Sequence, residues 1–251
     1  VMTAARLLEG TARSAEAAEA LFGAFERMSA AERETWRDPR LALVRTLAEV
    51  GDGRFTERMV PYLSDYDATV AEAVAEALRG WNGRPYTPTP RPLPRMALPS
   101  AEEMHQMDAS NVVLHMQGGG TIEIDLHPYL STTNTYRYWR LVREGHFDAL
   151  TFHRWAPNIV IQGGSPHANE YEGDGPYTRD EVCRLGHWRG TVGISTRGHD
   201  TGDGQIFVNL LDNVRLDHAY TIVGTVVNGM DVVDQVLEGG VIERAEIVPI
   251  P

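Results

Sequence analysis

The stretch FHRWAPNIVIQGG, residues Phe152 to Gly164, decides how the fold of this chain is interpreted. It places Arg154 ahead of a short apolar run and Gln162 at the end of that run, and a Gly-Gly pair then breaks the pattern. A short apolar run with such a boundary is typical of a buried strand. The pattern leaves two interpretations open: a buried strand that begins with an arginine, or two polar side chains that converge on one pocket wall.

The composition is that of an ordinary globular protein. With 251 residues, the chain is long enough for one large or two modest domains, each with a real core. No apolar run reaches the length that a membrane-spanning helix needs, so we expect a soluble chain. The chain opens at Val1 without the segments of a signal peptide, as would a chain trimmed from a longer precursor, and its compartment stays open.

The charge pattern excludes several classes of function. A formal net charge of -12 argues against a broad nucleic-acid surface, because phosphate binding needs clustered positive charge. The sequence contains no lysine, which excludes Schiff-base chemistry, lysine general bases and the P-loop lysine. Arginine is therefore the only permanently charged cationic side chain, and its rigid fork of donors can be aimed from a strand.

Metal-binding and disulfide patterns are weak. Cys183 is the only cysteine, so no intramolecular disulfide and no cysteine-based zinc cage can form. The nine histidines are scattered and include no HExxH pair. Cys183 and His187 are four residues apart, but no two further ligands lie near them in the sequence. We expect no metal site.

Residues 1–81 have the pattern of several short helices. Ser14 precedes apolar residues at a 3.6-residue period and is expected to cap a helix. Ser29–Glu32 predicts a capping box, and Asp38–Pro39 predicts the start of a helix that stops at Gly51. Further helices are expected over Phe55 to Leu63 and up to Trp81. The alternation resembles HEAT-like repeats; an ordinary helical bundle is the alternative, and either would be a packing or partner-binding element.

A proline-rich segment separates this helical region from the rest of the chain. Between Asn82 and Pro99 six prolines forbid both a helix and a central strand. Such a segment favours polyproline II and acts as a semi-rigid spacer, although it could instead dock on a neighbouring surface. We therefore divide the chain into a helical region over 1–81, a Pro-rich linker over 82–110 and a third domain over 111–251.

From Asn111 onward the periodicity is that of strands. Two helices, Thr133 to Arg143 and about Met230 to Leu237, interrupt eight short strand candidates. The strand candidates are Val112–Met116, Thr121–Leu126, Leu150–Arg154, Ile159–Gln162, Thr191–Ser195, Ile206–Asn209, Thr221–Val227 and Ile242–Val248. This pattern predicts a closed antiparallel barrel of eight strands with two helices covering its open ends, so the whole chain is a multidomain protein, α and then mainly β.

Four motifs in this region resemble those of the cyclophilin-type peptidyl-prolyl isomerases, in the same order and spacing. They are FHRWAPNIVIQGG at Phe152–Gly164, GTVGIS at Gly190–Ser195, GDGQIFVNL at Gly202–Leu210 and LDHAYTIVGTVVNGMDVVD at Leu216–Asp234. The resemblance covers about Asn111 to Pro251. It implies an eight-stranded barrel that catalyses cis/trans isomerisation of X-Pro bonds without a cofactor.

The resemblance also assigns site residues. Arg154 matches the family's catalytic arginine, and Gln162 matches the glutamine that holds the substrate backbone. The wall of the proline pocket is matched by Phe207, Leu216, Tyr220, Ile159 and Val160. Ser195 and Thr196 fall where the family pairs with the substrate main chain, and Gln205 falls beside that groove.

The sequence departs from the family pattern at the pocket edge. Ile159 stands where the family usually has Phe, Val160 where Met is common, and Tyr220 where many members have His. Arg215 occupies the place of a tryptophan that helps some members bind a cyclic-peptide inhibitor, so activity is expected more than inhibitor sensitivity. Arg197, near the groove, is interpreted as an exposed loop residue.

Rotation about an X-Pro bond can be catalysed by hydrogen-bond donors and apolar side chains alone, and the stretch 152–164 contains both. Partial double-bond character sets a barrier of about 18 to 20 kcal/mol, but no bond is broken. A catalyst has to favour the twisted amide, in which the prolyl nitrogen regains a lone pair, and Arg154 is a cation with directed donors. We expect an isomerase acting on proline-containing polypeptides, with partner contacts on the helical region; the alternative is a proline-peptide binding module or scaffold with little turnover.

Overall fold

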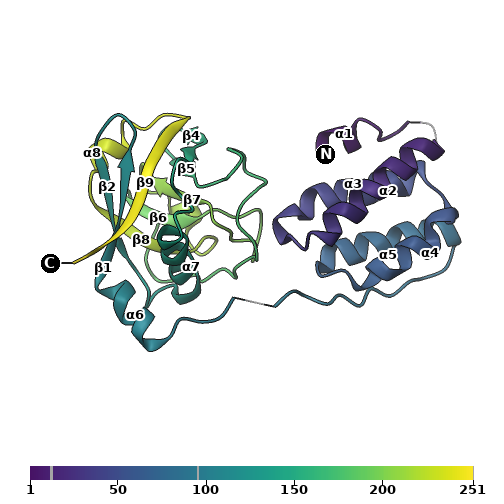
Figure 1. The fold of residues 1–251 in the computed structure, drawn as a ribbon, viewed down its shortest axis with the longest axis horizontal. Coiled ribbons are helices and arrows are strands. Elements are labelled where there is room, and N and C mark those ends of the chain that lie inside the picture. Colours follow the sequence, from purple (N-terminus) through teal and green to yellow (C-terminus); the bar gives the residue numbers. More distant parts are fainter. Residues whose placement is uncertain (12–13, 95, 251) are drawn as a thin grey trace. The chain divides into compact units, whose positions relative to one another are not determined.

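The computed structural model describes residues 1–11, 14–94 and 96–250 (Figure 1). Residue contacts divide the chain into two compact units, Val1–Pro94 and Arg95–Pro251. Each unit has its own hydrophobic core. Within the described residues, no helix is long and apolar enough to cross a membrane. Residue 251, the last of the range predicted for the third domain, lies outside the described residues.

The first unit is helical throughout. Its elements are α1 (Met2–Arg6), α2 (Ala15–Ala30), η1 (Glu34–Trp36), α3 (Arg37–Val50), η2 (Gly53–Phe55), α4 (Thr56–Met59), η3 (Val60–Ser64) and α5 (Ala68–Asn82), where η denotes a 3-10 helix. Helix α3 packs against both α2 and α5, and all three contribute to one apolar core. Helices are thus present where the sequence predicts them, while their assignment as HEAT repeats stays a prediction.

The predicted helix boundaries are partly correct. The Ser14 side chain accepts a hydrogen bond from Ala17 N–H at 3.2 Å and caps α2 as expected. The capping box at Ser29–Glu32 is wrong, because α2 continues to Ala30 and buries the Ser29 side chain. The start at Asp38–Pro39 is also wrong, because η1 leads directly into α3 and leaves Asp38 inside its first turn. The predicted stop at Gly51 is confirmed.

A buried ion pair ties α3 to the segment before α5. Arg40 on α3 is fully buried, and its Nη1 lies 2.8 Å from an oxygen of Asp65. The Arg40 guanidinium also lies over the ring of Tyr66, 4.0 Å from the ring centroid. Burial raises the pKa of the Asp65 carboxyl, although the attraction of Arg40 opposes that shift. Removing either partner would leave an uncompensated charge in the core.

The proline-rich segment makes specific contacts in its first half. Thr89 N–H donates to the carbonyl of Leu63 at 2.7 Å, and Arg91 N–H donates to the carbonyl of Asp65 at 3.1 Å. Alternate main-chain groups of the segment are thus bonded to the end of η3 and the residue after it. Residues 89–91 therefore lie on the helical unit in an extended conformation.

The range 82–110 also contains a helix that the sequence analysis does not predict. This helix is α6 (Ala101–Asp108), and a capping box of Ser100 and Glu103 begins it. Met107 on α6 is fully buried and belongs to the core of the second unit. The signal for it was the Ser-x-x-Glu spacing, which the surrounding prolines obscure.

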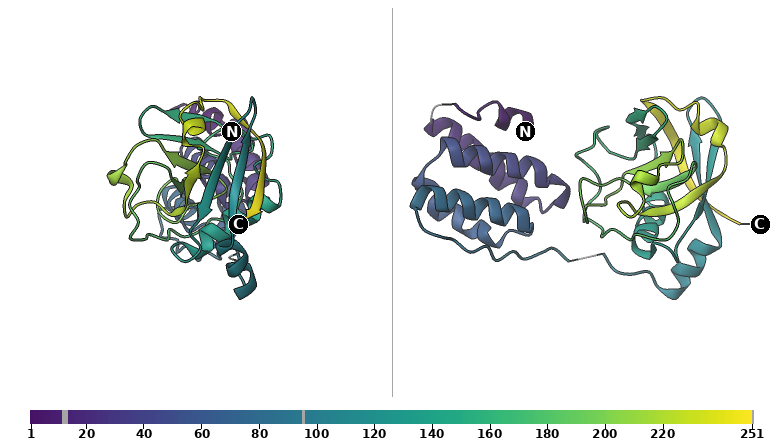
Figure 2. Two further views of the ribbon diagram at one scale, coloured as in Figure 1. Left: turned by 90° about the vertical axis from the view of Figure 1, so that its left-hand side faces the viewer. Right: turned by 180° about the vertical axis from the view of Figure 1, so that it is seen from behind.

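The second unit is an antiparallel sheet that wraps around a common interior (Figures 1 and 2). Its strands are β1 (Ser110–Met116), β2 (Thr121–Leu126), β3 (Thr151–Phe152), β4 (Arg154–Ala156), β5 (Val160–Gly163), β6 (Thr191–Ile194), β7 (Ile206–Asn209), β8 (Ile222–Asn228) and β9 (Gly240–Pro249). Their order in the sheet is β3-β9-β1-β2-β8-β6-β7-β5-β4.

The sheet has nine strands and is nearly closed, which corrects the expectation of eight strands in a closed barrel. The predicted strand Leu150–Arg154 is divided, because Thr151–Phe152 pairs with β9 whereas Arg154–Ala156 pairs with β5. The two edges of the sheet are therefore joined by one residue, His153. This change of partner brings the sheet ends together and leaves β4 to carry Arg154.

Besides α6, the two predicted helices pack against the sheet. Helix α7 (Thr132–Arg143) lies where the sequence predicts it, and it buries Tyr138, Trp139 and Val142 in the barrel core. Helix α8 (Met230–Val233) is shorter than the predicted Met230–Leu237 and packs on β2. The core is filled from alternating positions of the strands, so the opposite faces of β4, β5, β6 and β7 are left to build a site.

Candidate active site

The strand register aligns the two residues that open the motif. Arg154 on β4 lies directly opposite Gln162 on β5, so both side chains leave the same face of the sheet. Arg154 Nη1 donates to Gln162 Oε1 at 3.4 Å. Gln162 lies opposite Phe207 on β7, and Phe207 lies opposite Gly193 on β6. One row across four strands therefore presents an arginine, a glutamine, a phenylalanine and a glycine.

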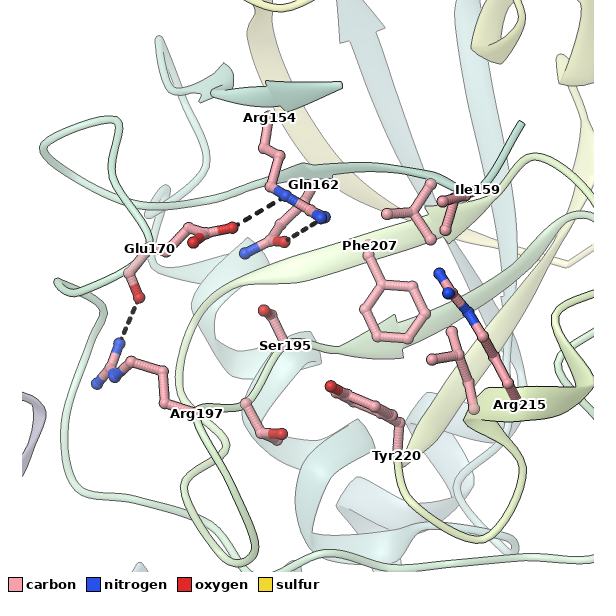
Figure 3. A pocket seen from close by; sticks show the side chains of 12 residues that line it. Arg154, Ile159, Gln162, Glu170, Ser195, Arg197, Phe207, Arg215 and Tyr220 are labelled. Atoms are coloured by element: carbon pink, nitrogen blue, oxygen red, sulfur yellow. Dashed lines mark hydrogen bonds and ion pairs between the residues drawn. The ribbon is translucent and has the colours of Figure 1, made fainter. Parts of the chain in front are cut away.

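A pocket of about 220 Å³ opens over this row (Figure 3). It is lined by Arg154, Ile159, Val160, Gln162, Glu170, Ser195, Thr196, Arg197, Phe207, Arg215, Leu216 and Tyr220. The structure thus brings together every site residue that the resemblance implies except Gln205. The side chain of Gln205 is buried behind the pocket and accepts a hydrogen bond from Gln162 Nε2 at 3.2 Å.

The apolar part of the pocket is built around Phe207. Tyr220 meets the Phe207 ring edge-on, with the ring centroids 5.7 Å apart and an interplanar angle of 90°. Leu216 enters from η4 (Val214–Leu216), Val160 begins β5, and Ile159 lies in the turn just before that strand. A ring of apolar side chains of this size can hold a pyrrolidine ring and exclude water from it.

His187 supports Phe207 from behind, a role that the sequence does not indicate. Its ring is stacked on Phe207, with centroids 6.0 Å apart and planes inclined by 19°. Both its backbone N–H, at 2.7 Å, and its Nδ1, at 3.1 Å, contact Asp217 Oδ1. Burial lowers the pKa of His187, against the opposing effect of Asp217, which favours the neutral form of the ring.

His187 thus binds Asp217 and packs on Phe207. The sequence analysis instead considers His187, together with Cys183, as a metal ligand. The Cys183 thiol faces the Leu185 carbonyl at 3.9 Å. Across residues 1–11, 14–94 and 96–250, no three His, Cys, Asp or Glu side chains gather as metal ligands would.

Glu170 is a pocket residue that the sequence analysis misses. Its Oε1 lies 3.0 Å from Arg154 Nε and forms an ion pair with it. Glu170 lies between β5 and β6, outside any helix or strand, and an acidic residue in such a segment carries no periodic signal. Only its contacts in three dimensions identify it.

Arg197 is not a simple exposed loop residue, which corrects the sequence interpretation. Its Nη1 donates to the main-chain carbonyl of Glu170 at 2.5 Å, and its Nη2 donates to the Tyr177 hydroxyl at 2.7 Å. Nη1 also lies 3.7 Å from a carboxylate oxygen of Asp203. Arg197 therefore fixes the segment that carries Glu170.

The remaining rim offers polar groups to a peptide. Ser195 N–H donates to the Gln205 carbonyl at 2.9 Å, and the chain then leaves β6. Within the described part of the chain, the main chain of Thr196 makes no hydrogen bond to another backbone group, so it is available to an extended ligand. Arg215 extends along the wall near Ile159 and Phe207 (Figure 3) and has no ion-pair partner among the described residues.

Comparison with known proteins agrees with this geometry. The family described as cyclophilin type peptidyl-prolyl cis-trans isomerase/CLD matches residues 111–249. Peptidyl-prolyl cis-trans isomerase B of Bacillus subtilis is 30% identical over 135 residues, which cover 53% of this chain and 94% of that protein. A peptidyl-prolyl cis-trans isomerase of Acinetobacter baylyi is 31% identical over 136 residues, covering 51% of this chain and 72% of that protein.

The fold is also that of a solved structure. The cyclophilin type peptidyl-prolyl cis-trans isomerase of Cryptosporidium parvum superposes with a TM-score of 0.53 at 20% sequence identity. The match covers 57% of this chain and 99% of that one. Together with the family match over 111–249, it shows that the chain belongs to the cyclophilin-type peptidyl-prolyl cis-trans isomerases.

Proposed function

We propose that the pocket over β4, β5, β6 and β7 accelerates rotation of X-Pro bonds in protein substrates, with Arg154 as its catalytic residue. The observation that carries this proposal is the register that sets Arg154, Gln162 and Phe207 in one row. In that row a donor fork, a backbone-binding amide and an apolar floor follow one another. A prolyl peptide needs all three surfaces, because the fork faces the prolyl nitrogen, the amide holds the backbone before the proline and the floor holds the ring.

Arg154 acts on the amide nitrogen of the proline. The planar amide delocalises the nitrogen lone pair, whereas the amide twisted by about 90° releases it, at a cost of about 18 to 20 kcal/mol. A guanidinium donor aimed at that nitrogen binds the twisted amide more strongly than the planar one, which is the condition for catalysis. Because no proton is transferred and no bond is broken, no nucleophile and no cofactor is required.

The other residues hold the two ends of the rotating bond. Phe207, Leu216 and Tyr220 enclose the proline ring, and Ile159 and Val160 complete that wall. Gln162 and the main chain after Ser195 bind the backbone on the other side, so that one end turns against the other. An acceleration of about 10⁶ requires about 8 kcal/mol, which several such contacts can supply together.

The proposal is tested by Arg154→Ala with a short X-Pro peptide whose cis/trans exchange is followed by NMR. We expect a loss of at least about 100-fold in kcat/KM, typical for the loss of a directed donor at a developing charge. Arg140→Ala is the matched control, because Arg140 is a half-exposed arginine of α7 in the same unit, paired with Glu144. An inactive wild-type chain, or an unchanged Arg154→Ala variant, contradicts the proposal.

A second candidate is a proline-peptide binding module with little turnover. The observation that favours it is Ile159, which replaces a larger aromatic ring of the family pattern at the pocket edge. A looser pocket can retain a peptide while it holds the proline less firmly in the twisted state. Peptide binding without acceleration of exchange supports this candidate, and the NMR experiment above separates the two.

The helical unit is proposed to contact a protein partner. A cavity of about 280 Å³ between α5 and the following segment is lined by Glu72, Ala75, Glu76, Arg79, Pro85, Tyr86 and Pro88. Its carboxylates and aromatic ring suit a polar, basic segment of another protein. The test is a pull-down with Glu72→Arg and Glu76→Arg together, and a partner that binds this variant as it binds wild type contradicts the proposal.

A further inference from the structure

The side chain of Arg154 belongs to a closed ring of contacts. Arg154 Nη1 donates to Gln162 Oε1 at 3.4 Å, and Gln162 Nε2 donates to Gln205 Oε1 at 3.2 Å. Gln205 Nε2 then donates to the main-chain carbonyl of Glu170 at 3.4 Å. The Glu170 carboxylate closes the ring with its ion pair to Arg154 Nε at 3.0 Å. Figure 3 shows the two contacts of Arg154 side by side.

Within this ring the contact to Glu170 is the tight one. A hydrogen bond from N–H to oxygen is normally 2.7 to 3.2 Å long, so about 3.4 Å to Gln162 is a weak restraint. The ion pair to Glu170 is shorter and joins opposite charges. Since the Arg154 side chain is 44% exposed, packing alone does not immobilise its long, flexible chain.

The segment that carries Glu170 is itself held in place. Besides Gln205, the Arg197 guanidinium binds the Glu170 carbonyl at 2.5 Å. Gln205 Nε2 also binds the Glu172 carbonyl at 3.1 Å, and Ser165 Oγ donates to that same carbonyl at 2.6 Å. Hydrogen bonds from the buried Gln205 and from Arg197 thus hold the main chain at Glu170 in place. The Glu170 carboxylate therefore contacts Arg154 from a backbone of fixed position.

The ion pair leaves the working edge of the guanidinium open. Glu170 faces Nε and Gln162 faces Nη1, so in the described part of the chain Nη2 has no protein partner. An arginine that searches many rotamers loses conformational entropy when it engages the twisted amide. A carboxylate on Nε removes part of that cost in advance, because the planar fork turns as one body. The negative charge of Glu170 also weakens the electrostatic attraction between Arg154 and the amide. Solvent screens this opposing effect, because both side chains are partly exposed.

We propose that Glu170 is a positioning residue for isomerisation, which holds the Arg154 guanidinium by its Nε edge so that Nη2 points into the pocket. This inference rests on the proposed role of Arg154. It assigns a function in the reaction to the segment between β5 and β6, and it makes the catalytic arginine dependent on a carboxylate that the family motifs in this sequence do not contain.

The test compares kcat and KM for cis/trans exchange of one X-Pro peptide in wild type, Glu170→Ala, Glu170→Gln, Arg154→Ala and the double variant of Glu170→Ala with Arg154→Ala. We expect Glu170→Ala to lower kcat about two- to fivefold with little change in KM, the range that an exposed ion pair supports. Glu170→Gln keeps an oxygen acceptor at the same reach, so we expect it to lose less than half as much of kcat as Glu170→Ala does. Added to Arg154→Ala, Glu170→Ala has no further effect.

Glu243→Ala is the control for the lost charge, because Glu243 is an exposed glutamate on β9, away from the pocket lining. Unfolding midpoints of all variants confirm that the barrel is intact. An active wild type with Glu170→Ala equal to it or faster overturns the inference and leaves the proposed function standing. The inference is also overturned if Glu170→Ala lowers kcat by the same factor in wild type and in the Arg154→Ala variant, because a purely structural role of Glu170 would act in both. An inactive wild type contradicts the proposed function itself.

Discussion

Gly193 lies directly opposite Phe207 across β6 and β7, and a methyl group on Gly193 would approach Phe207 Cζ to 2.3 Å. The absence of a side chain at Gly193 is therefore what allows the end of the Phe207 ring to lie over this residue of β6. Phe207 is only 4% exposed and is stacked on His187, so it has no other space within the pocket to occupy. The floor of the proposed proline pocket therefore depends on a glycine one strand away.

Gly193→Ala is expected to displace the Phe207 ring and close part of the pocket. Overpacking of this kind costs about 1–3 kcal/mol of the free energy of unfolding. We expect kcat/KM for an X-Pro peptide to fall by more than the stability loss explains, because the ring moves into the space of the substrate proline. Peptide turnover and urea unfolding of the same variant measure both effects. A variant that loses stability but keeps wild-type KM shows that Phe207 does not line the proline site.

The stability of the barrel is expected to fall between neutral and mildly acidic pH because of His187. Burial lowers its pKa in the folded state below the usual value of about 6.5, which the unfolded chain retains. In that window the unfolded chain binds more protons, so the free energy of unfolding falls as pH drops through about 6.5 and levels off below the folded pKa. His153, whose pKa burial also lowers, acts in the same direction.

The measurement is urea unfolding from pH 8 to pH 5 for wild type and for His187→Phe. The variant keeps a ring behind Phe207 but cannot titrate, so its stability should depend less steeply on pH. Asp217 does not titrate between pH 8 and pH 5, because its hydrogen bonds with His187 lower the pKa of the Asp217 carboxyl below its usual acidic value. A variant with the same slope as wild type contradicts the prediction.

The buried pair in the helical unit supports a prediction that is independent of the active site. Arg40→Ala leaves the Asp65 carboxylate buried without its partner, which should destabilise the unit by about 3–5 kcal/mol. Replacing Arg37 by alanine should cost less, although its Nε pairs with the equally buried Asp67 at 2.5 Å, because the Arg37 side chain is 27% exposed and Asp67 still accepts two backbone N–H bonds at the start of α5. Calorimetry of the whole chain measures both, and equal losses for the two variants would show that burial does not decide the cost.

Much of the site could be predicted from the sequence because its residues stand in motifs that resemble those of the family, although several of them lie outside the strands. Arg154 and Gln162 belong to one short hairpin, and Phe207 belongs to an apolar strand with a recognisable motif. Glu170 could not be predicted, since its place depends on contacts with Arg197 and Gln205, 27 and 35 residues further along the chain. The ninth strand was also hidden, because periodicity is continuous through His153 while the pairing partner changes there.

The last prediction concerns the charge that a substrate carries beside its proline. Of the three arginines in the pocket lining, Arg154 is paired with Glu170 and Arg197 contacts Asp203, whereas Arg215 has no ion pair among the described residues. Arg215 extends along the wall at Ile159 and Phe207, next to where the proline would lie (Figure 3). An acidic residue next to the proline can therefore pair with a cation that is otherwise free.

We expect peptides with glutamate beside the proline to be turned over about two- to fivefold more efficiently than the same peptides with glutamine, as an exposed ion pair supports. Arg215→Gln should remove this preference and leave the turnover of the neutral peptide nearly unchanged. Because the pair is exposed, 0.5 M salt should reduce the preference in wild type. Glutamate and glutamine peptides that are turned over equally by wild type at low salt would contradict a role for Arg215 in substrate selection, and a preference that survives Arg215→Gln would assign it to another cation of the pocket.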